Sequence, residues 1–341
     1  MSFLTENVGS SHVSSISILD TDIEINKILI VRPNHRLGNM ILTTPLIQEV
    51  IDTFPNCEID LLAKGNIAPI IFNNYTNIKD YILLPRKPFN ELIKYCLVWF
   101  KVKNRKYDLV INAVKGSSSG KLLTKISNSR YKVFGEIDDK VIDKNSDSYH
   151  MAKNPIYNLR SYFSVLGLHK NERKIASLDI KLAKDEMVEG GSILKDIFKN
   201  DKKTISIFTY ATGSKCYSKS WWCEFYTQLK INNPDYNILE ILPAEYVSQI
   251  DFEAETFYSN DIREVASVIA NTDLFIGADS GIMHLASSTK TTVVGLFSKT
   301  RKEKYKPYGN GSLAIDTNAN NANQIKQIIK EVLGKRMCLM S

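Results

Sequence analysis

The sequence has few cysteines, and their spacing does not suggest a structural metal site or a disulfide framework. The five cysteines include no Cys-x-x-Cys pair, and an odd number cannot all pair with one another. These features exclude a zinc knuckle and a small disulfide-stapled scaffold. They favour a reducing, cytoplasmic setting.

Long apolar runs are also missing. No segment approaches the roughly 18 uninterrupted apolar residues that mark a membrane-spanning helix, so any membrane contact is expected to be peripheral. Residues 1–25 are polar and Ser-rich, without the basic start and apolar centre of a secretory signal. We therefore expect these residues to form a disordered leader.

The remaining composition is that of an ordinary globular protein. The chain has 341 residues, of which 43% are hydrophobic and 24% charged, and this length allows about two domains. The net charge of +7 favours anionic partners, and its excess is concentrated between Tyr81 and Lys132, which hold 12 basic and two acidic residues. This stretch is expected to face an anionic acceptor or a membrane. No basic helix with base-reading residues accompanies it, so nucleic acid is not expected as a partner.

Short β-branched runs alternate with amphipathic stretches from Lys27 onward, which is typical of parallel α/β sheets. One series of strands is expected at 27–33, 58–63, 81–85, 107–113 and 132–135, and a second at 204–210, 237–243, 273–278 and 291–298. Pro155 is expected to open a helix, residues 184–203 to form a polar Gly-containing stretch, and residues 322–333 to form a closing helix. The expected fold is α/β, with two Rossmann-like domains at 26–185 and 186–336 that face one another across a cleft.

The turn after the first expected strand is one candidate site, and it contains His35, Arg36, Gly38 and Asn39. A glycine where a strand meets a helix permits a tight turn and lets backbone N–H groups face an anion. Gly38 is equally explained as a plain turn residue. His35 titrates in the range that suits proton transfer near neutral pH, although an ordinary loop histidine is the alternative.

A second candidate joins the expected strand 273–278 to a helix. Asp279 and Ser280 are natural N-cap residues, and Gly281 allows a ligand to approach the backbone closely. The free N–H groups of this helix start would suit a diphosphate or sugar hydroxyls. His284, one turn later, faces either the ligand or the neighbouring strand. A capped helix with a buried histidine is the structural alternative.

A third candidate follows the expected strand 204–210 and runs from Thr212 to Trp222. Lys215 or Lys219 could clamp a phosphate there while an indole supports the loop by packing. Solvated lysines and a core tryptophan explain the same residues without a ligand.

Taken in order, these segments resemble the glycosyltransferase family 9 enzymes, which include the ADP-heptose:lipopolysaccharide heptosyltransferases. The resemblance spans roughly Lys27 to Thr300. It is carried by KILIVRPNHRLGNMILTTPLI (27–47), which is similar to a strand followed by R-x-x-x-L-G-D and a T-x-P helix, by the K-x-W element at 219–221, and by TDLFIGADSGIMHLASSTKTTVVGLF (272–297). The last segment, with its D-[ST]-G-x-x-H-L-A core, is the most specific.

The resemblance implies a GT-B fold, with the acceptor bound in the N-terminal domain and a nucleotide-sugar donor mainly in the C-terminal one. It implies an inverting, metal-independent glycosyltransferase with no cofactor, using ADP-heptose and acting on a lipopolysaccharide core or related anionic glycolipid at the inner membrane. By carry-over, the donor-binding residues are Thr212, Lys215, Lys219, Glu245, Asp279, Ser280, Gly281 and His284. The acceptor-side residues are Arg36, Gly38 and Asn39.

One position departs from the family pattern. The aspartate of the L-G-D element, which the family implies as the catalytic base, is Asn39 here, and an amide has no useful basicity. His35 or Asp279 removes the proton instead, or Asn39 only orients the acceptor, or the chain is a weak or inactive relative that binds nucleotide sugars. The segment 241–246 also lacks the usual G-x-x-x-E context, so the assignment of Glu245 to the donor ribose has less support than the other donor contacts. A transferase that uses a different donor for a capsular or other surface polysaccharide is therefore an alternative.

Overall fold

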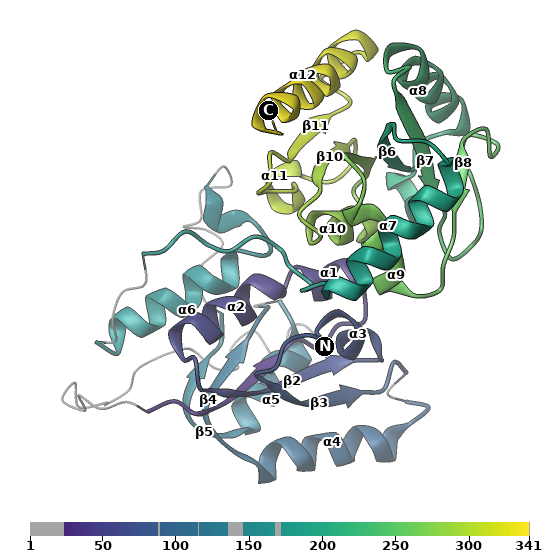
Figure 1. Ribbon diagram of the computed structural model, residues 1–341. Helices are drawn as coiled ribbons and strands as arrows, with labels where there is room; N and C mark the ends of the chain where they lie inside the picture. The colour runs from purple at the N-terminus through teal and green to yellow at the C-terminus, as the bar shows by residue number, and fades with distance from the viewer. Residues whose placement is uncertain (1–23, 88, 115, 136–145, 168–171, 341) are drawn as a thin grey trace. The chain divides into compact units, whose positions relative to one another are not determined.

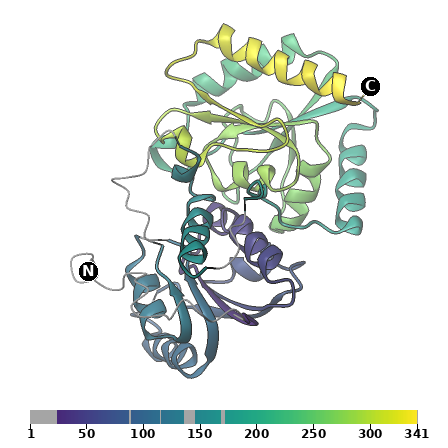
Figure 2. The same cartoon turned by 90° about the vertical axis from the view of Figure 1, so that its left-hand side faces the viewer.

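The computed structural model divides the chain into two compact units, Met1–Ala176 and Ser177–Ser341. It describes residues 24–87, 89–114, 116–135, 146–167 and 172–340. Each unit is a parallel β-sheet with helices on both faces (Figures 1 and 2). The unit boundary therefore precedes the expected one, which was placed after residue 185. Most of the expected leader lies outside the described residues, but Ile25 at its end is buried.

The first unit contains a five-stranded sheet in the order β3-β2-β1-β4-β5. Its strands are β1 Lys27–Val31, β2 Glu58–Lys64, β3 Ile78–Leu84, β4 Lys106–Asn112 and β5 Asn128–Val133. Every pair is parallel, as between β1 and its neighbours, where Leu29 aligns with Asp60 and with Val110. The central strands are buried on both faces, which explains their near-continuous apolar sequences.

Helices cover both faces of this sheet (Figure 1). They are α1 Leu37–Ile41, α2 Thr44–Thr53, α3 Ile67–Ile71, α4 Leu92–Asn104, α5 Ser118–Ile126 and α6 Asn154–Val165, with a short 3-10 turn at Asp147–Tyr149. Pro45 and Pro155 occupy the first turns of α2 and α6, where a missing backbone N–H costs nothing. A partly buried, bidentate pair joins these two helices, with Arg160 Nε and Nη2 each 2.8 Å from a carboxylate oxygen of Glu49.

The second unit contains a six-stranded sheet in the order β11-β10-β9-β6-β7-β8. Its strands are β6 Lys203–Phe208, β7 Tyr236–Ile241, β8 Glu255–Phe257, β9 Leu274–Ala278, β10 Thr292–Phe297 and β11 Leu313–Asp316. Its helices are α7 Lys184–Phe198, α8 Lys219–Asn232, α9 Ile262–Ala270, α10 Gly281–Ser287, α11 Lys302–Tyr305 and α12 Ala322–Met340, and a 3-10 turn spans Gly213–Lys215. The two parallel α/β units confirm the predicted fold class.

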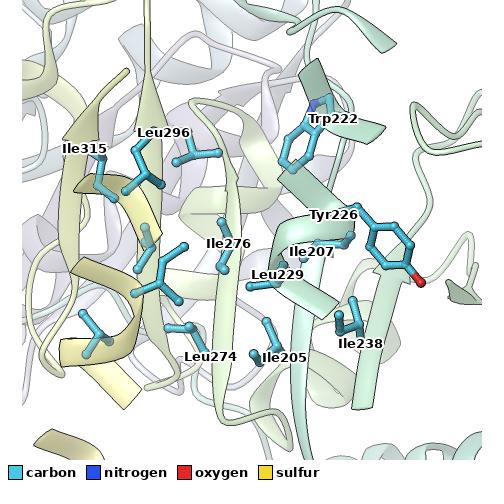
Figure 3. Packing of buried hydrophobic residues seen from close by; sticks show 14 of the residues in the cluster. Ile205, Ile207, Trp222, Tyr226, Leu229, Ile238, Leu274, Ile276, Leu296 and Ile315 are labelled. Atoms are coloured by element: carbon cyan, nitrogen blue, oxygen red, sulfur yellow. The ribbon is translucent and has the colours of Figure 1, made fainter. Parts of the chain in front are cut away.

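A hydrophobic core fills the space between this sheet and helices α8 and α12. Alternate residues of the central strands, such as Ile205 of β6 and Ile276 of β9, point to this face and share one buried cluster with Trp222 of α8 (Figure 3). Ile325 and Ile329 of α12 complete the cluster, so the expected closing helix does pack back onto the sheet. Burial of this face fixes the register of the strands, because a slip by one residue would turn the same side chains to the other face.

The stretch at 184–203 is not an irregular linker, because most of it forms α7. Asp185 and Glu186 lie in its first turn, where carboxylates favour the positive end of the helix dipole. Gly190 lies against α9, and a Cβ atom there would approach the Ser267 carbonyl carbon to 2.4 Å. Gly190 thus allows the two helices to pack closely.

Candidate functional site

Three neighbouring strands of the second unit send their carboxyl ends to one edge of the sheet. β6, β9 and β10 are adjacent in the strand order, and the loops that follow them begin at Thr209, Asp279 and Ser298. Open α/β sheets bind ligands at this edge. The topology therefore brings together the second and third sequence candidates, which lie some distance apart in the chain.

Asp279 is the centre of the polar group at this edge. Its side chain is buried, and its Oδ2 accepts hydrogen bonds from Lys215 Nζ at 3.3 Å and from Thr300 Oγ1 at 2.8 Å. Its backbone N–H donates to the Leu296 carbonyl of β10 at 3.1 Å. The loops after β6, β9 and β10 thus meet at one carboxylate. A polar ligand bound here could contact the Lys215 ammonium, the Thr300 hydroxyl and the Asp279 carboxylate.

Ser280 and Gly281 begin α10 as the sequence predicts. Ser280 has an extended backbone, and its Oγ accepts a hydrogen bond from the Met283 N–H at 3.1 Å, which makes it the N-cap. Gly281 is the first helical residue. The start of α10 directly follows Asp279, so its backbone donors lie beside the carboxylate.

His284 is buried behind Asp279, with Nε2 3.8 Å from Asp279 Oδ1. Its Nδ1 has no hydrogen-bond partner among the described residues. Burial lowers the pKa of His284 to about 4, against the opposing effect of the Asp279 charge, and Lys215 lowers it further. The imidazole is therefore neutral at pH 7 and lies buried beside Asp279.

This buried histidine predicts a pH-dependent loss of stability. The unfolded chain binds a proton at His284 near pH 6.5, whereas the folded chain does so only near pH 4, so acidification through this window favours unfolding. The contribution is on the order of 3 kcal/mol between pH 7 and pH 4. In urea titrations we expect His284→Gln to lose less stability than wild type over this range. Parallel pH dependences in the two proteins would exclude this role.

Lys219 lies apart from the Asp279 group. It is the first residue of α8, capped by Ser218, and it forms an exposed ion pair with Asp251 of the loop after β7. That pairing raises the pKa of Lys219 through the hydrogen bond to the carboxylate. Thr212 and Glu245 are both exposed in loops at the same edge of the sheet. The structure thus brings Lys215, Asp279 and His284 together, while no described contact joins Thr212, Lys219 or Glu245 to them.

The sequence analysis missed several polar residues at this edge. Thr300 follows β10 and bonds directly to Asp279. Glu240, at the end of β7, is fully buried and accepts hydrogen bonds from Thr209 Oγ1 at 2.6 Å and Ser248 Oγ at 2.7 Å. Burial raises the pKa of Glu240. Glu240 could have been predicted as a buried polar residue, because it is the one acid in the apolar run NILEILP. Its hydrogen bond with Ser248 holds the loop that carries Asp251.

The first candidate forms a separate polar group in the first unit. Asn39 lies in α1, and its Nδ2 donates to Asn34 Oδ1 at 3.2 Å, while the same oxygen accepts the Arg36 N–H at 2.8 Å. Gly38 is buried, whereas His35 and Arg36 are exposed. Burial lowers the pKa of His35, and the nearby charges of Lys64, Arg86 and Arg36 lower it further. His35 is therefore neutral at pH 7 within a cationic surrounding.

A cavity of about 410 Å³ lies elsewhere in the second unit, between α8 and α12. Trp221 and Phe225 stack at 5.1 Å along one wall, and Ile325 and Ile329 lie on the other. None of the predicted site residues lines it. Among the described residues, no cluster of three His, Cys, Asp or Glu side chains is placed to hold a metal ion.

Residues 258–333 match the family model described as glycosyltransferase family 9 (heptosyltransferase). This part of the chain is therefore similar to glycosyltransferase family 9. The matched segment includes Asp279, Ser280, Gly281, His284 and Thr300, whereas Lys215, Lys219 and Asn39 lie outside it. No curated protein sequence matches this chain.

Solved structures of similar fold include a glycosyltransferase family 9 protein and two heptosyltransferases. A glycosyltransferase family 9 protein from Veillonella parvula has a TM-score of 0.74 at 16% identity, covering 92% of this chain and 98% of its own. The E. coli heptosyltransferase WaaC with ADP has a TM-score of 0.65 at 15% identity, covering 90% and 99%. E. coli ADP-heptose lps heptosyltransferase II has a TM-score of 0.63 at 14% identity, covering 91% and 99%. These similarities establish the GT-B fold of this chain.

Proposed function

We propose that this chain is an inverting, metal-independent glycosyltransferase that moves heptose from ADP-heptose to a lipopolysaccharide core or related anionic glycan. The observation that carries the proposal is the group of Lys215, Asp279 and Thr300 beside the start of α10, within or next to the segment that matches the family. The four described cysteines are free, which agrees with the cytoplasmic setting proposed for the enzyme.

The reaction replaces the bond between the anomeric carbon and the diphosphate by a bond to an acceptor hydroxyl oxygen. The diphosphate departs with the bonding electron pair, and the hydroxyl proton passes to a base. Lys215, helped by backbone N–H groups at the start of α10, would stabilise the growing charge on the leaving diphosphate. Asp279 and Ser280 would hold hydroxyl groups of the donor. Lys219, at the start of α8, would reach the same phosphates only by leaving its ion pair with Asp251.

His35 is the candidate base that the surroundings favour. It is neutral at pH 7, and it lies on the exposed loop that also carries Arg36, whereas Asp279 already accepts two hydrogen bonds. The cations around His35 disfavour its protonated form, but the negative charge of an anionic acceptor would offset them. Asn39 Nδ2, bonded to Asn34, is suited to orienting the acceptor and not to removing a proton.

We expect His35→Gln to lower kcat/KM for transfer about a hundredfold, as loss of a general base commonly does. The acidic limb of the wild-type pH–rate profile should lie below pH 6.5, because the pKa of His35 is lowered, and the variant should lack this limb. Asn39→Ala should retain transfer within a few-fold. If Asn39→Asp instead raises turnover strongly, position 39 is a degraded base and His35 is not the proton acceptor.

Transfer assays with a panel of donors test the function as a whole. We expect purified protein, treated with EDTA, to transfer heptose from ADP-heptose to truncated lipopolysaccharide with inversion at the anomeric carbon, as read by mass spectrometry and NMR. Transfer from UDP- or GDP-sugars would favour the alternative of a capsular or other surface polysaccharide. Donor binding without transfer or hydrolysis would indicate a nucleotide-sugar-binding pseudo-enzyme, the alternative that Asn39 supports.

A further inference from the structure

Helix α4 of the first unit has apolar residues on two opposite faces. Its inner face packs against the buried cluster that contains Leu29, Leu62 and Leu123. The residues that make this contact are Tyr95, Val98, Trp99 and Val102. A surface helix normally has a polar outer face, so a helix that is apolar nearly all round implies a partner for the second face.

The outer face of α4 is a continuous exposed stripe. Ile93, Leu97 and Phe100 follow one another at helical spacing and are 79%, 61% and 63% exposed. Leu92, at the start of α4, and Phe89, in the preceding turn, extend the stripe with 59% and 89% exposure. We call these five residues the outer stripe. They are five of the 11 exposed large hydrophobic side chains among the described residues, which marks an interaction surface.

Lysines border the outer stripe along both edges. At 3.6 residues per turn, Lys94 and Lys101 lie on one side of it and Lys103 on the other. Lys94 pairs with Glu91 at 2.7 Å and Lys101 with Asp80 at 2.8 Å. Lys103 is exposed, and among the residues that the structure describes it has no acidic partner. The surrounding segment from Tyr81 to Lys132 holds 12 basic and two acidic residues.

We propose that the outer stripe docks the protein on the surface of an anionic lipid bilayer. The apolar side chains would enter the boundary between headgroups and acyl chains, while the bordering lysines reach the lipid phosphates. At 13 residues, α4 is about 20 Å long, which suits a helix lying in the plane of the bilayer. A second copy of the chain fits this face less well, because dimerisation would bring two lysine-bordered stripes together. This docking does not depend on the identity of the donor sugar.

Vesicle flotation with the full chain tests the proposal. We expect the protein to float with vesicles of phosphatidylcholine and phosphatidylglycerol, and at least about tenfold less with phosphatidylcholine alone. The double substitution Leu97→Glu and Phe100→Glu should lower the bound fraction at least about tenfold, because charge on this face opposes insertion. Lys103→Glu should weaken binding at low salt, and the weakening should shrink as ionic strength rises.

Two matched controls separate the outer stripe from exposed apolar residues in general. Val188 of α7 and Ile231 of α8 are 73% and 65% exposed in the second unit, and Val188→Glu and Ile231→Glu should leave flotation unchanged. Unfolding midpoints in urea should be the same for all these variants, since every substituted side chain is exposed.

Three outcomes would overturn the proposal. Equal binding to anionic and neutral vesicles would remove the electrostatic argument. Flotation of Leu97→Glu, Phe100→Glu at the wild-type level would place the contact elsewhere. A wild-type dimer in light scattering, converted to a monomer by this double substitution with no flotation in either case, would assign the stripe to a second copy of the chain.

Discussion

The Asp279→Asn variant is expected to lose about a hundredfold in kcat/KM for sugar transfer, with its stability nearly unchanged. The substitution keeps the size of the side chain but removes its negative charge. In the wild type, Asp279 Oδ2 accepts hydrogen bonds from Lys215 Nζ at 3.3 Å and from Thr300 Oγ1 at 2.8 Å. Hydrogen bonds to a charged group contribute about 1.5–3 kcal/mol each, and losing one in the transition state gives this factor. Steady-state kinetics over a range of donor concentrations provide the measurement.

Asp273, which directly precedes β9, offers a matched control for Asp279, which directly follows it. It lies at the opposite, amino-terminal end of β9, where its Oδ2 accepts from the Thr204 N–H at 3.0 Å. Asp273→Asn makes the same chemical change away from the proposed site and should leave kcat/KM within a few-fold of wild type. Equal losses in the two variants would mean that Asp279 acts through folding. Full activity in Asp279→Asn would remove it from the donor site.

Arg263→Met is expected to destabilise the second unit by about 3 kcal/mol, because it leaves Glu186 without its buried partner. Arg263 Nη2 lies 2.8 Å from Glu186 Oε2, and the guanidinium also donates to the carbonyl oxygens of Ile180 and Lys181 at 3.2 Å. These contacts hold α7 and its preceding segment against α9. With Trp99 replaced by Phe, the fluorescence of Trp221 and Trp222 reports urea unfolding of this unit alone.

The exposed pair Lys219–Asp251 in the same unit provides the comparison. Solvent screens this pair, so Lys219→Met should leave the unfolding midpoint unchanged. Adding Glu186→Gln to Arg263→Met should recover part of the loss, since the carboxylate that has lost Arg263 is then removed. A midpoint for Arg263→Met that equals wild type would show that the α7–α9 contact depends on packing alone.

Much of the fold can be predicted from the hydrophobic pattern of the sequence. The strands that this pattern misses or misplaces are those that are only partly buried. The apolar runs at 27–31 and 292–297 form central strands that are buried on both faces, and these were predicted within a few residues. β8 and β11, at the two edges of the second sheet, are short and only partly buried, so their sequences carry little hydrophobic signal. β5 is also an edge strand. Because it begins with polar residues at Asn128, the strand was predicted too late in the chain, at 132–135.

The candidate site is harder to read from sequence, since it depends on strand order. Asp279, Ser280 and His284 are close in sequence, so one capped helix was enough to predict their grouping. Lys215 reaches Asp279 because β6 lies beside β9, and no local pattern reveals that neighbour. Thr300 was missed for the same reason. The pairing of Lys219 with Asp251 depends on a loop in which Asp251 and Phe252 adopt the left-handed backbone region, which sequence rarely signals for such residues.

A crystal structure of the protein soaked with ADP-heptose is the most direct test of the proposed donor site. We expect the diphosphate within hydrogen-bond distance of Lys215 Nζ and of the backbone N–H groups at the start of α10, with Asp279 against the donor. Donor density in the cavity between α8 and α12, with Asp279 still bonded only to Lys215 and Thr300, would contradict it.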